Sequence, residues 1–124
     1  MAHDVLLVED SSTQAEQIKN TLENTGLTVL VVGDGPEAIR EAMTNPPRLI
    51  VLDINLPSMD GYQVCRRLKR NPDTRDIPVI MLTEQSSAKD TMTGLQAGAD
   101  DYIPKDIFAG EHLLDTLREL GLIE

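Results

Sequence analysis

The sequence predicts an α/β protein built on a parallel five-stranded sheet that is doubly wound, with helices on both faces. Five short apolar runs recur along the chain, and their first residues are 20 to 30 positions apart. The segments between these runs carry apolar residues at helical spacing. Because a crossover between parallel strands usually contains a helix, this alternation favours a (βα)₅ arrangement.

The first strand and helix are predicted from an apolar run and the stripe that follows it. Val5–Val8 is an unbroken run of Val and Leu, which is typical of a strand buried on both faces of a parallel sheet. Ser11 or Ser12 can cap the first helix, and Gly26 follows its end. The helix has an apolar stripe at i, i+3 and i+7, formed by Ala15, Ile18 and Leu22.

The second and third units repeat this pattern with proline marking the helix ends. Val29–Val32 and Leu49–Leu52 are the next two strands, and Pro36 suits the first position of the second helix. Asn45-Pro46-Pro47 stops the second helix and Asn71-Pro72 stops the third. The stripes of these two helices are Ala38-Ile39-Ala42-Met43 and Gly61-Val64-Cys65-Leu68.

The last two units combine an unbroken fourth strand with a weaker fifth one. Val79–Leu82 is the fourth strand, and Tyr102-Ile103 is a shorter fifth strand. With Asp101 before it and Pro104 at its end, the fifth strand resembles a protected sheet edge. The corresponding helical stripes are Ala88-Met92-Leu95 and Leu113-Leu114-Leu117-Leu120.

Composition narrows the functional classes. The 124 residues, which we expect to form a single domain over 1–124, include 11 Lys and Arg against 21 Asp and Glu, a net charge of −10. This balance argues against nucleic acid or a membrane surface as partner, because both need a basic footprint. Cys65 lies on an apolar stripe, so we expect a buried thiol and no internal disulfide. No apolar run approaches the length of a membrane span, and we expect a cytoplasmic protein.

Polar residues follow four of the apolar runs at the carboxyl ends of the strands, where open α/β sheets bind ligands. They are Glu9-Asp10, Asp53, Thr83 and Lys105. Two carboxylates about 4 Å apart repel by roughly 4 kcal/mol at an effective dielectric constant near 20. Three carboxylates and one lysine leave two net negative charges, which one divalent cation would balance. Oxygen ligands without His or Cys favour Mg²⁺, and a carboxylate beside Mg²⁺ and lysine can attack phosphorus.

Several motifs in this order resemble the response-regulator receiver domain, the family of the chemotaxis protein CheY. The motifs are VLLVED at 5–10, LIVLDINLPSMDG at 49–61, VIMLT at 79–83 and AGADDYIPK at 97–105. The resemblance covers essentially the whole chain. It implies a flavodoxin-like sandwich with strand order 2-1-3-4-5, an order that periodicity alone does not select.

The resemblance also implies a phosphoacceptor and a metal site. Asp53 would accept the phosphoryl group, and Glu9 and Asp10 would hold Mg²⁺ together with Asp53. Asn55, two residues after the acceptor, would offer its backbone carbonyl to the metal. We therefore expect Mg²⁺ as the cofactor.

The resemblance assigns the remaining site residues to phosphoryl binding and signalling. Thr83 and Lys105 would bind the phosphoryl oxygens, and Thr83 and Tyr102 would form the switch. The phosphodonor would be a sensor histidine kinase or a phosphotransfer protein. The surface of the fourth helix, fifth strand and fifth helix would meet a downstream protein target or a second receiver. Catalysis would be limited to the chain's own phosphorylation and dephosphorylation, so we do not expect an enzyme in the usual sense.

Two positions depart from the family's usual residues, and two more bear on the lifetime of the phosphoryl group. Asp106 follows Lys105 where the family usually has proline, often in a cis peptide. Glu84 follows Thr83 where the family usually has a small residue, and its carboxylate can hinder a phosphodonor. Gln85 and Asn55 occupy positions that tune self-dephosphorylation in the family. These departures bear on rates more than on chemistry.

Other interpretations stay open at this point. One is a receiver that is part of a larger regulator or hybrid kinase, which would carry the output elsewhere. Another is a receiver-like interaction module that is never phosphorylated, which Glu84 and Asp106 leave open. A small-molecule phosphatase of the haloacid dehalogenase type fits less well, because Asn55 stands where that class has a second aspartate as general acid.

Overall fold

The computed structural model describes residues 3–85 and 87–124 and shows strands and helices in strict alternation. Each strand is followed by one helix, as the apolar runs and stripes predict. The elements are β1 (Val5–Val8), α1 (Ser12–Glu23), β2 (Val29–Val32), α2 (Gly35–Thr44), β3 (Leu49–Leu52), α3 (Gly61–Arg70), β4 (Val79–Thr83), α4 (Ala88–Gln96), β5 (Asp101–Pro104) and α5 (Ala109–Glu119).

The strands form one parallel sheet in the order β2-β1-β3-β4-β5, which confirms the predicted fold class and strand order. Val8 at the end of β1 pairs with Leu52 at the end of β3. The backbone N–H of Asp53 donates to the Val8 carbonyl at 3.0 Å. This register brings Glu9 and Asp53, the residues that follow these two strands, to the same edge of the sheet.

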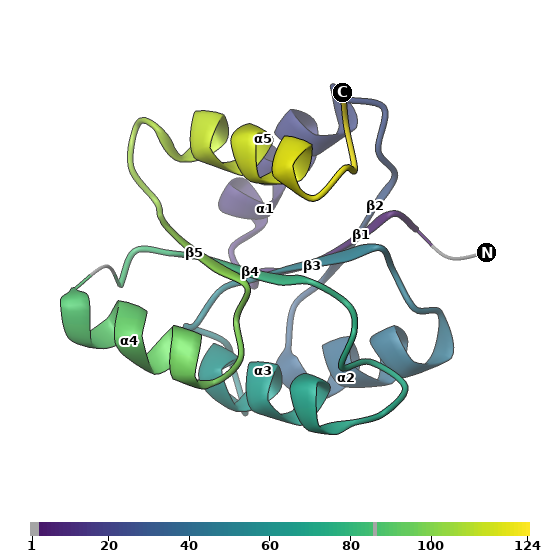
Figure 1. The fold of residues 1–124 in the computed structure, drawn as a ribbon, viewed down its shortest axis with the longest axis vertical. Helices are drawn as coiled ribbons and strands as arrows, with labels where there is room; N and C mark the ends of the chain where they lie inside the picture. The colour runs from purple at the N-terminus through teal and green to yellow at the C-terminus, as the bar shows by residue number, and fades with distance from the viewer. Residues whose placement is uncertain (1–2, 86) are drawn as a thin grey trace.

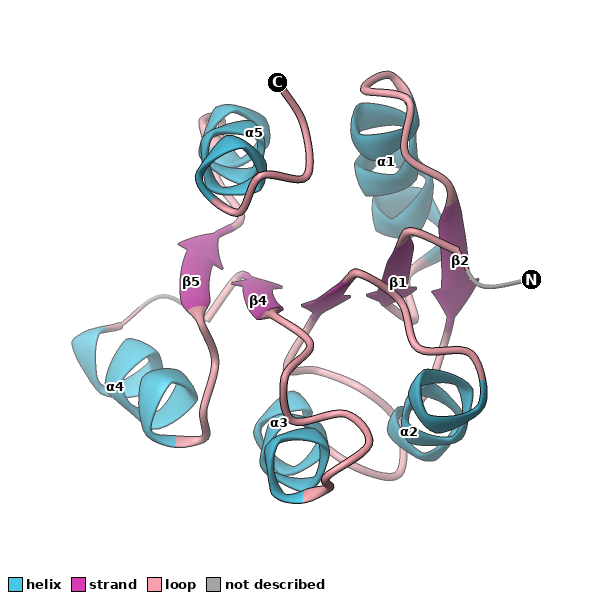
Figure 2. Ribbon diagram, turned by 45° about the vertical axis from the view of Figure 1, so that its right-hand side comes forward, coloured by secondary structure: helices cyan, strands magenta, loops and turns pink. Residues whose placement is uncertain are grey.

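The sheet lies between two layers of helices. Helices α1 and α5 cover one face, and α2, α3 and α4 cover the other (Figures 1 and 2). Side chains alternate along β1, so that Val5 and Leu7 pack in the core under α1 and α5 while Leu6 and Val8 pack in the core on the opposite side. Both faces of each central strand are therefore buried, which explains why the runs are continuously apolar.

Most helical stripes face the core, but the stripe predicted for the fourth helix does not. Met92 and Leu95 of α4 are 57% and 48% exposed. The inner side of α4 is instead formed around Gly94, where an added Cβ would lie 2.6 Å from the Tyr102 ring. A glycine carries no apolar side chain, so the hydrophobic pattern gives the wrong phase for this helix. Leu120, at the end of the last stripe, is also exposed.

Several boundaries differ from the predicted ones by one residue. Thr83 is the last residue of β4, and β5 begins at Asp101. Asp101 is tolerated in a strand because its carboxylate accepts a hydrogen bond from Thr116 Oγ1 at 2.7 Å. Ser11 is the cap of α1, where its Oγ accepts from the backbone N–H of Gln14. Throughout the described residues the peptide bonds are trans, including the one after Lys105.

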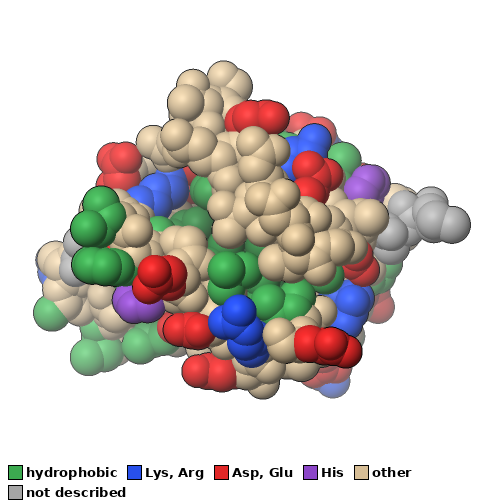
Figure 3. Space-filling model, turned by 90° about the horizontal axis from the view of Figure 1, so that it is seen from above, with side chains coloured by type: hydrophobic (Ala, Val, Ile, Leu, Met, Phe, Trp, Pro, Cys, Tyr) green, Lys and Arg blue, Asp and Glu red, His purple; other side chains and the backbone are tan. Residues whose placement is uncertain are grey.

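Cys65 is buried, as predicted, and its thiol contacts the Ala97 carbonyl at 3.6 Å. None of the helices within 3–85 and 87–124 combines the length and apolar character that a bilayer crossing requires. Seen from the side of α1 and α5, acidic side chains are spread over the surface and hydrophobic side chains line a hollow in its middle (Figure 3).

Candidate functional site

Lys105, the residue directly after β5, lies at the centre of the candidate site. Its Nζ atom is 2.5 Å from Glu9 Oε1 and 3.0 Å from Asp53 Oδ2, and it also donates to Gln14 Oε1. An ammonium has three N–H donors, so these three acceptors use all of them. The ends of β1, β3 and β5 are thereby linked through one side chain.

The two carboxylates that contact Lys105 are almost fully buried. Glu9 is 3% exposed and Asp53 is 7% exposed. The second oxygen of each carboxylate is also bound, since Asp53 Oδ1 accepts from the Ile54 backbone N–H at 2.7 Å and Glu9 Oε2 accepts from the Ser11 N–H at 3.3 Å. Both groups are therefore held in fixed positions by the backbone as well as by the lysine.

Burial and mutual repulsion make this cluster electrostatically costly. Burial raises the pKa of Glu9, and the nearby charge of Asp53 raises it further, while the contact with Lys105 acts in the opposite direction. For Lys105, burial opposes the charged form, but the hydrogen bonds to the Glu9 and Asp53 carboxylates outweigh it and raise the pKa. The lysine remains charged, and the site keeps an excess of negative charge.

The remaining predicted metal ligands lie at the solvent side of this cluster. The side chains of Asp10 and Asn55 are exposed, and Asn55 Oδ1 accepts from Gln85 Nε2 at 2.8 Å. In the part of the chain that the structure describes, no three acidic, histidine or cysteine side chains form a ready-made metal-binding group. The donors at hand are nevertheless oxygens only, which suits Mg²⁺, an ion that usually keeps several waters beside one or two carboxylates.

Thr83 and Tyr102 meet at a common neighbour in the segment after β4. Thr83 is fully buried, and its Oγ1 accepts from the Gln85 backbone N–H at 3.3 Å. The Tyr102 hydroxyl donates to the Gln85 carbonyl and lies 3.4 Å from the hydroxyl of Tyr62. The backbone N–H of Lys105 donates to the Thr83 carbonyl at 2.8 Å. The two predicted switch residues are thus joined through one residue, Gln85.

This order of acidic, threonine and lysine residues at successive strand ends matches a known sequence family. The family model for the response regulator receiver domain matches residues 5–118. The chain belongs to the response-regulator receiver family. The CheY-like resemblance and the flavodoxin-like fold that it implied are therefore confirmed.

Relatives of this receiver include whole regulators and domains of kinases. The response regulator MprA of Mycobacterium ulcerans is 40% identical over 116 residues, which are 94% of this chain and 49% of that protein. The receiver thus spans about half the length of the curated relatives it matches. A receiver domain of a signal transduction histidine kinase from Syntrophus aciditrophicus is 44% identical, with a TM-score of 0.86 over 96% of this chain and 89% of that one.

One solved neighbour holds a metal ion. The receiver domain of sensor histidine kinase PA1611 from Pseudomonas aeruginosa has a magnesium ion coordinated in its active-site cleft. It is 32% identical to this chain, with a TM-score of 0.85 over 98% of this chain and 99% of that one. Receiver domains as a family bind Mg²⁺ in this place.

Two polar neighbours of the site were not predicted from the sequence of this receiver. Gln14 contacts Lys105 from the first turn of α1, and Tyr62 contacts Tyr102 from α3 while donating to the Asp90 carbonyl at 3.1 Å. Gln14 lies four residues after Asp10 at the same end of the sheet, so its position gave a weak signal. For Tyr62 no sequence signal was available, because its partner is distant along the chain.

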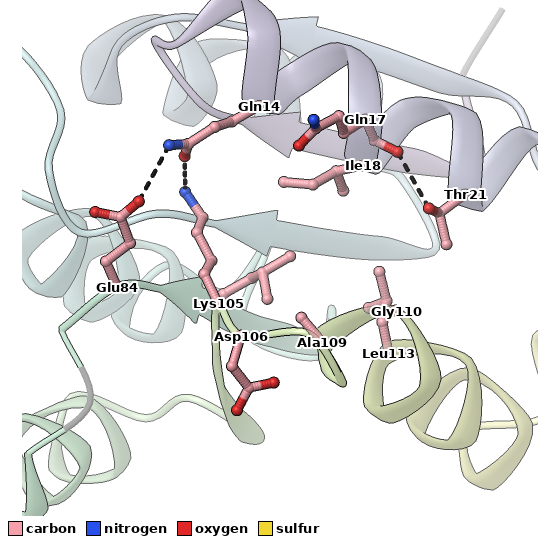
Figure 4. Close-up of a pocket in the computed structure, with 11 residues that line it drawn as sticks. Gln14, Gln17, Ile18, Thr21, Glu84, Lys105, Asp106, Ala109, Gly110 and Leu113 are labelled. Carbon is pink, nitrogen blue, oxygen red and sulfur yellow. Dashed lines mark hydrogen bonds between the residues drawn. The ribbon is translucent and has the colours of Figure 1, made fainter.

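A groove between α1 and α5 adjoins the lysine. Its volume is about 340 Å³, and Gln14, Lys105 and Glu84 lie at one end of it (Figure 4). Gln14 Nε2 donates to Glu84 Oε1 at 3.2 Å. Glu84, the unusual residue after Thr83, is therefore tied to helix α1 rather than projecting freely over Asp53.

Proposed function

We propose that this receiver accepts a phosphoryl group on Asp53 from a phosphohistidine of a sensor kinase or phosphotransfer protein. The observation that supports this most directly is the ammonium of Lys105, which contacts the buried carboxylates of both Asp53 and Glu9. A carboxylate that attacks phosphorus must be held in position, with a positive charge beside it. The family membership of the chain supports the same assignment.

In the proposed transfer, an Asp53 oxygen attacks phosphorus and forms a new O–P bond. The P–N bond to the donor imidazole breaks, and the nitrogen keeps the bonding pair and takes up a proton. Lys105 donates N–H bonds to the phosphoryl oxygens, and the Thr83 hydroxyl donates a second bond. Phosphoryl transfer depends mainly on such positioning and charge neutralisation.

Mg²⁺ is the cofactor that this donor set fits. The carboxylates of Glu9, Asp10 and Asp53 and the backbone carbonyl of Asn55 would hold the ion. When bound, it neutralises the oxygens of the transferred group. The excess negative charge that Lys105 leaves uncompensated supports this assignment.

The output of the proposed reaction is a change in shape rather than in charge. A phosphate carries about −1.5 to −2 at pH 7 where the carboxylate already carried −1. As Thr83 moves toward the phosphoryl group, its contact with Gln85 changes, and Gln85 is the acceptor of the Tyr102 hydroxyl. We propose that this biases the surface of α4, β5 and α5 toward a second receiver or a downstream protein.

This surface already exposes apolar side chains. Met92 and Leu95 of α4 lie on it. The receiver spans about half the length of its curated relatives. We therefore propose that the same surface can also control a further part of a longer protein. The proposed catalysis is limited to the receiver itself, namely its phosphorylation and the hydrolysis of its acyl phosphate.

The decisive test is the intact mass of the protein after incubation with acetyl phosphate and Mg²⁺. We expect one added phosphoryl group in the wild type, none with EDTA, and none in Asp53→Asn. Asp115→Asn, which changes an exposed carboxylate of α5, is the matched control and should be labelled normally. Labelling of Asp53→Asn would reject Asp53 as the acceptor.

A second measurement tests the switch. Thr83→Ala should still be labelled but should lose the shifts in the amide spectrum that follow phosphorylation of the wild type. Unchanged shifts would refute the role of Thr83. If the wild type neither takes up phosphate nor binds Mg²⁺, the chain is an interaction module with a receiver fold.

A further inference from the structure

The side chain of Gln14 lies between a cation and an anion at the edge of the site. Its Oε1 accepts from Lys105 Nζ, and its Nε2 donates to Glu84 Oε1 at 3.2 Å (Figure 4). An ammonium only donates hydrogen bonds, and a carboxylate only accepts them. The amide therefore satisfies both neighbours in a single orientation.

The position of Gln14 is itself fixed by the acidic end of β1. Its backbone N–H donates to Ser11 Oγ at 3.3 Å, and the Ser11 N–H donates to Glu9 Oε2 at 3.3 Å. Glu9, Ser11 and Gln14 thus form a local chain of hydrogen bonds at the start of α1. This chain places the amide at a defined distance from the carboxylates that hold Lys105.

Glu84 lines the same groove as Lys105, and its carboxylate is a second potential acceptor for the ammonium. It directly follows Thr83, and its side chain is exposed. A free carboxylate at this place can pair with the ammonium of Lys105 directly, and a charged pair is stronger than a pair with a neutral amide. Such a contact would draw Nζ toward the groove and away from Asp53 Oδ2, where it lies at 3.0 Å.

We propose that Gln14 is a positioning residue: it keeps the ammonium of Lys105 on Asp53 and holds Glu84 away from that lysine. This inference rests on the proposed phosphorylation of Asp53. It assigns a role to a helix residue outside every motif of the family resemblance. It also explains how this receiver accommodates a carboxylate directly after Thr83.

The test measures the rate of phosphorylation by acetyl phosphate, in which Asp53 attacks phosphorus and acetate leaves with the bonding pair of the broken P–O bond. Gln14→Met keeps the length of the side chain and removes both hydrogen bonds. We expect its rate constant to fall about three- to tenfold, as for loss of one contact to a charged group. Gln17→Met, one turn along the same groove, is the control and should retain the wild-type rate.

Two double variants separate positioning from a general loss of structure. In Gln14→Met with Glu84→Met the competing carboxylate is gone, and the rate should return to within about twofold of the wild type. In Gln14→Glu with Glu84→Gln a carboxylate replaces the amide beside Lys105 Nζ and pairs with the ammonium directly, so the rate should stay below that of the wild type. A rate for Gln14→Met equal to that of Gln17→Met, or no recovery in Gln14→Met with Glu84→Met, would overturn the proposal.

A spectroscopic readout keeps this test independent of the proposed function. The ¹⁵Nζ–¹Hζ signal of Lys105 reports the hydrogen bonds of its ammonium without any phosphodonor. We expect Gln14→Met to shift this signal and Gln17→Met to leave it unchanged. If the wild type is not labelled, phosphorylation is refuted and the Lys105 signal still decides the positioning role; an unshifted signal refutes that role.

Discussion

Replacement of Gly61 by alanine tests how tightly the start of α3 packs against the loop that carries Asp53. Gly61 is the buried first residue of α3, and its N–H donates to the Ile54 carbonyl at 2.9 Å. A Cβ atom built at this position would lie 2.2 Å from the Asp53 carbonyl oxygen and 2.8 Å from Ile54 Cα. Both contacts are with backbone atoms, so no side-chain rotation can relieve them. The start of α3 must move away from β3.

The expected loss of stability follows from these distances. Overpacking costs about 1–3 kcal/mol, and two backbone contacts this close place Gly61→Ala at the upper end. Alanine regains up to about 1 kcal/mol of helix propensity, which leaves a net loss of about 2 kcal/mol. With a urea m-value of about 1.5 kcal/mol/M, the unfolding midpoint should fall by about 1.3 M. Displacement of Asp53 should also slow its proposed phosphorylation by up to about a hundredfold.

The matched control is Gly110→Ala in α5, where no atom outside the local helix backbone lies within 4 Å of the new Cβ. This substitution should raise the free energy of unfolding by about 0.5–1 kcal/mol, because glycine weakens a helix. Urea unfolding of both variants, followed by circular dichroism, gives the comparison. A midpoint for Gly61→Ala within about 0.3 M of the wild type, or the same sign for both variants, would refute this account.

Four further predictions concern pH, Tyr102, the buried Glu9 carboxylate and the metal. A hydrogen bond from the Thr28 backbone N–H, with a second from the Thr28 hydroxyl, holds the pKa of Asp4 below its usual value. The stabilisation by Asp4 is therefore present above about pH 4 and is lost as pH falls through the folded-state pKa. Asp4→Asn should lower stability to urea at pH 7 and make little difference near pH 2. Gly94→Ala should displace the Tyr102 ring, since its Cβ would lie 2.6 Å from Cδ2, and unchanged ring resonances would contradict this. Glu9→Gln should stabilise the metal-free protein at pH 7, because a buried carboxylate whose pKa is raised by burial is costly. Mg²⁺ should raise the melting temperature of the wild type, because binding adds about 1.4 kcal/mol of stability for each tenfold excess of the ion over its Kd. The melting temperature of Glu9→Gln should not change, and an equal rise in both proteins would exclude Glu9 as a ligand.

The alternation of strands and helices was predictable because the strands are buried on both faces, whereas the strand order came from the family resemblance. An unbroken apolar run such as Leu49–Leu52 is typical of a strand buried on both faces of a parallel sheet. The spacing of the runs leaves room for one helix between each pair. The pattern failed at α4, where Gly94 rather than Met92 and Leu95 faces the sheet. Hydrophobic periodicity cannot identify a face whose contact depends on the absence of a side chain.

The site was only partly predictable for a different reason. Glu9, Asp53 and Lys105 directly follow strands, so the parallel register alone brings them to one edge of the sheet. Gln14 and Glu84 meet through the packing of α1 beside the end of β4, which depends on side-chain conformation and on no sequence period. Residues placed by backbone register can be inferred from sequence, whereas residues placed by side-chain packing require coordinates.

The number of hydrogen-bond donors at Lys105 limits how the proposed switch can work. All three N–H groups already point to Glu9, Asp53 and Gln14. A phosphoryl group on Asp53 brings new acceptor oxygens to a lysine with no spare donor, so one existing contact must be given up or a further donor must approach. The Thr83 hydroxyl is such a donor, since its oxygen only accepts a 3.3 Å bond from Gln85. Thr83 is therefore expected to move toward the phosphoryl group because Lys105 has no free N–H donor for it. Tyr102 responds because its hydroxyl is bound to the same Gln85.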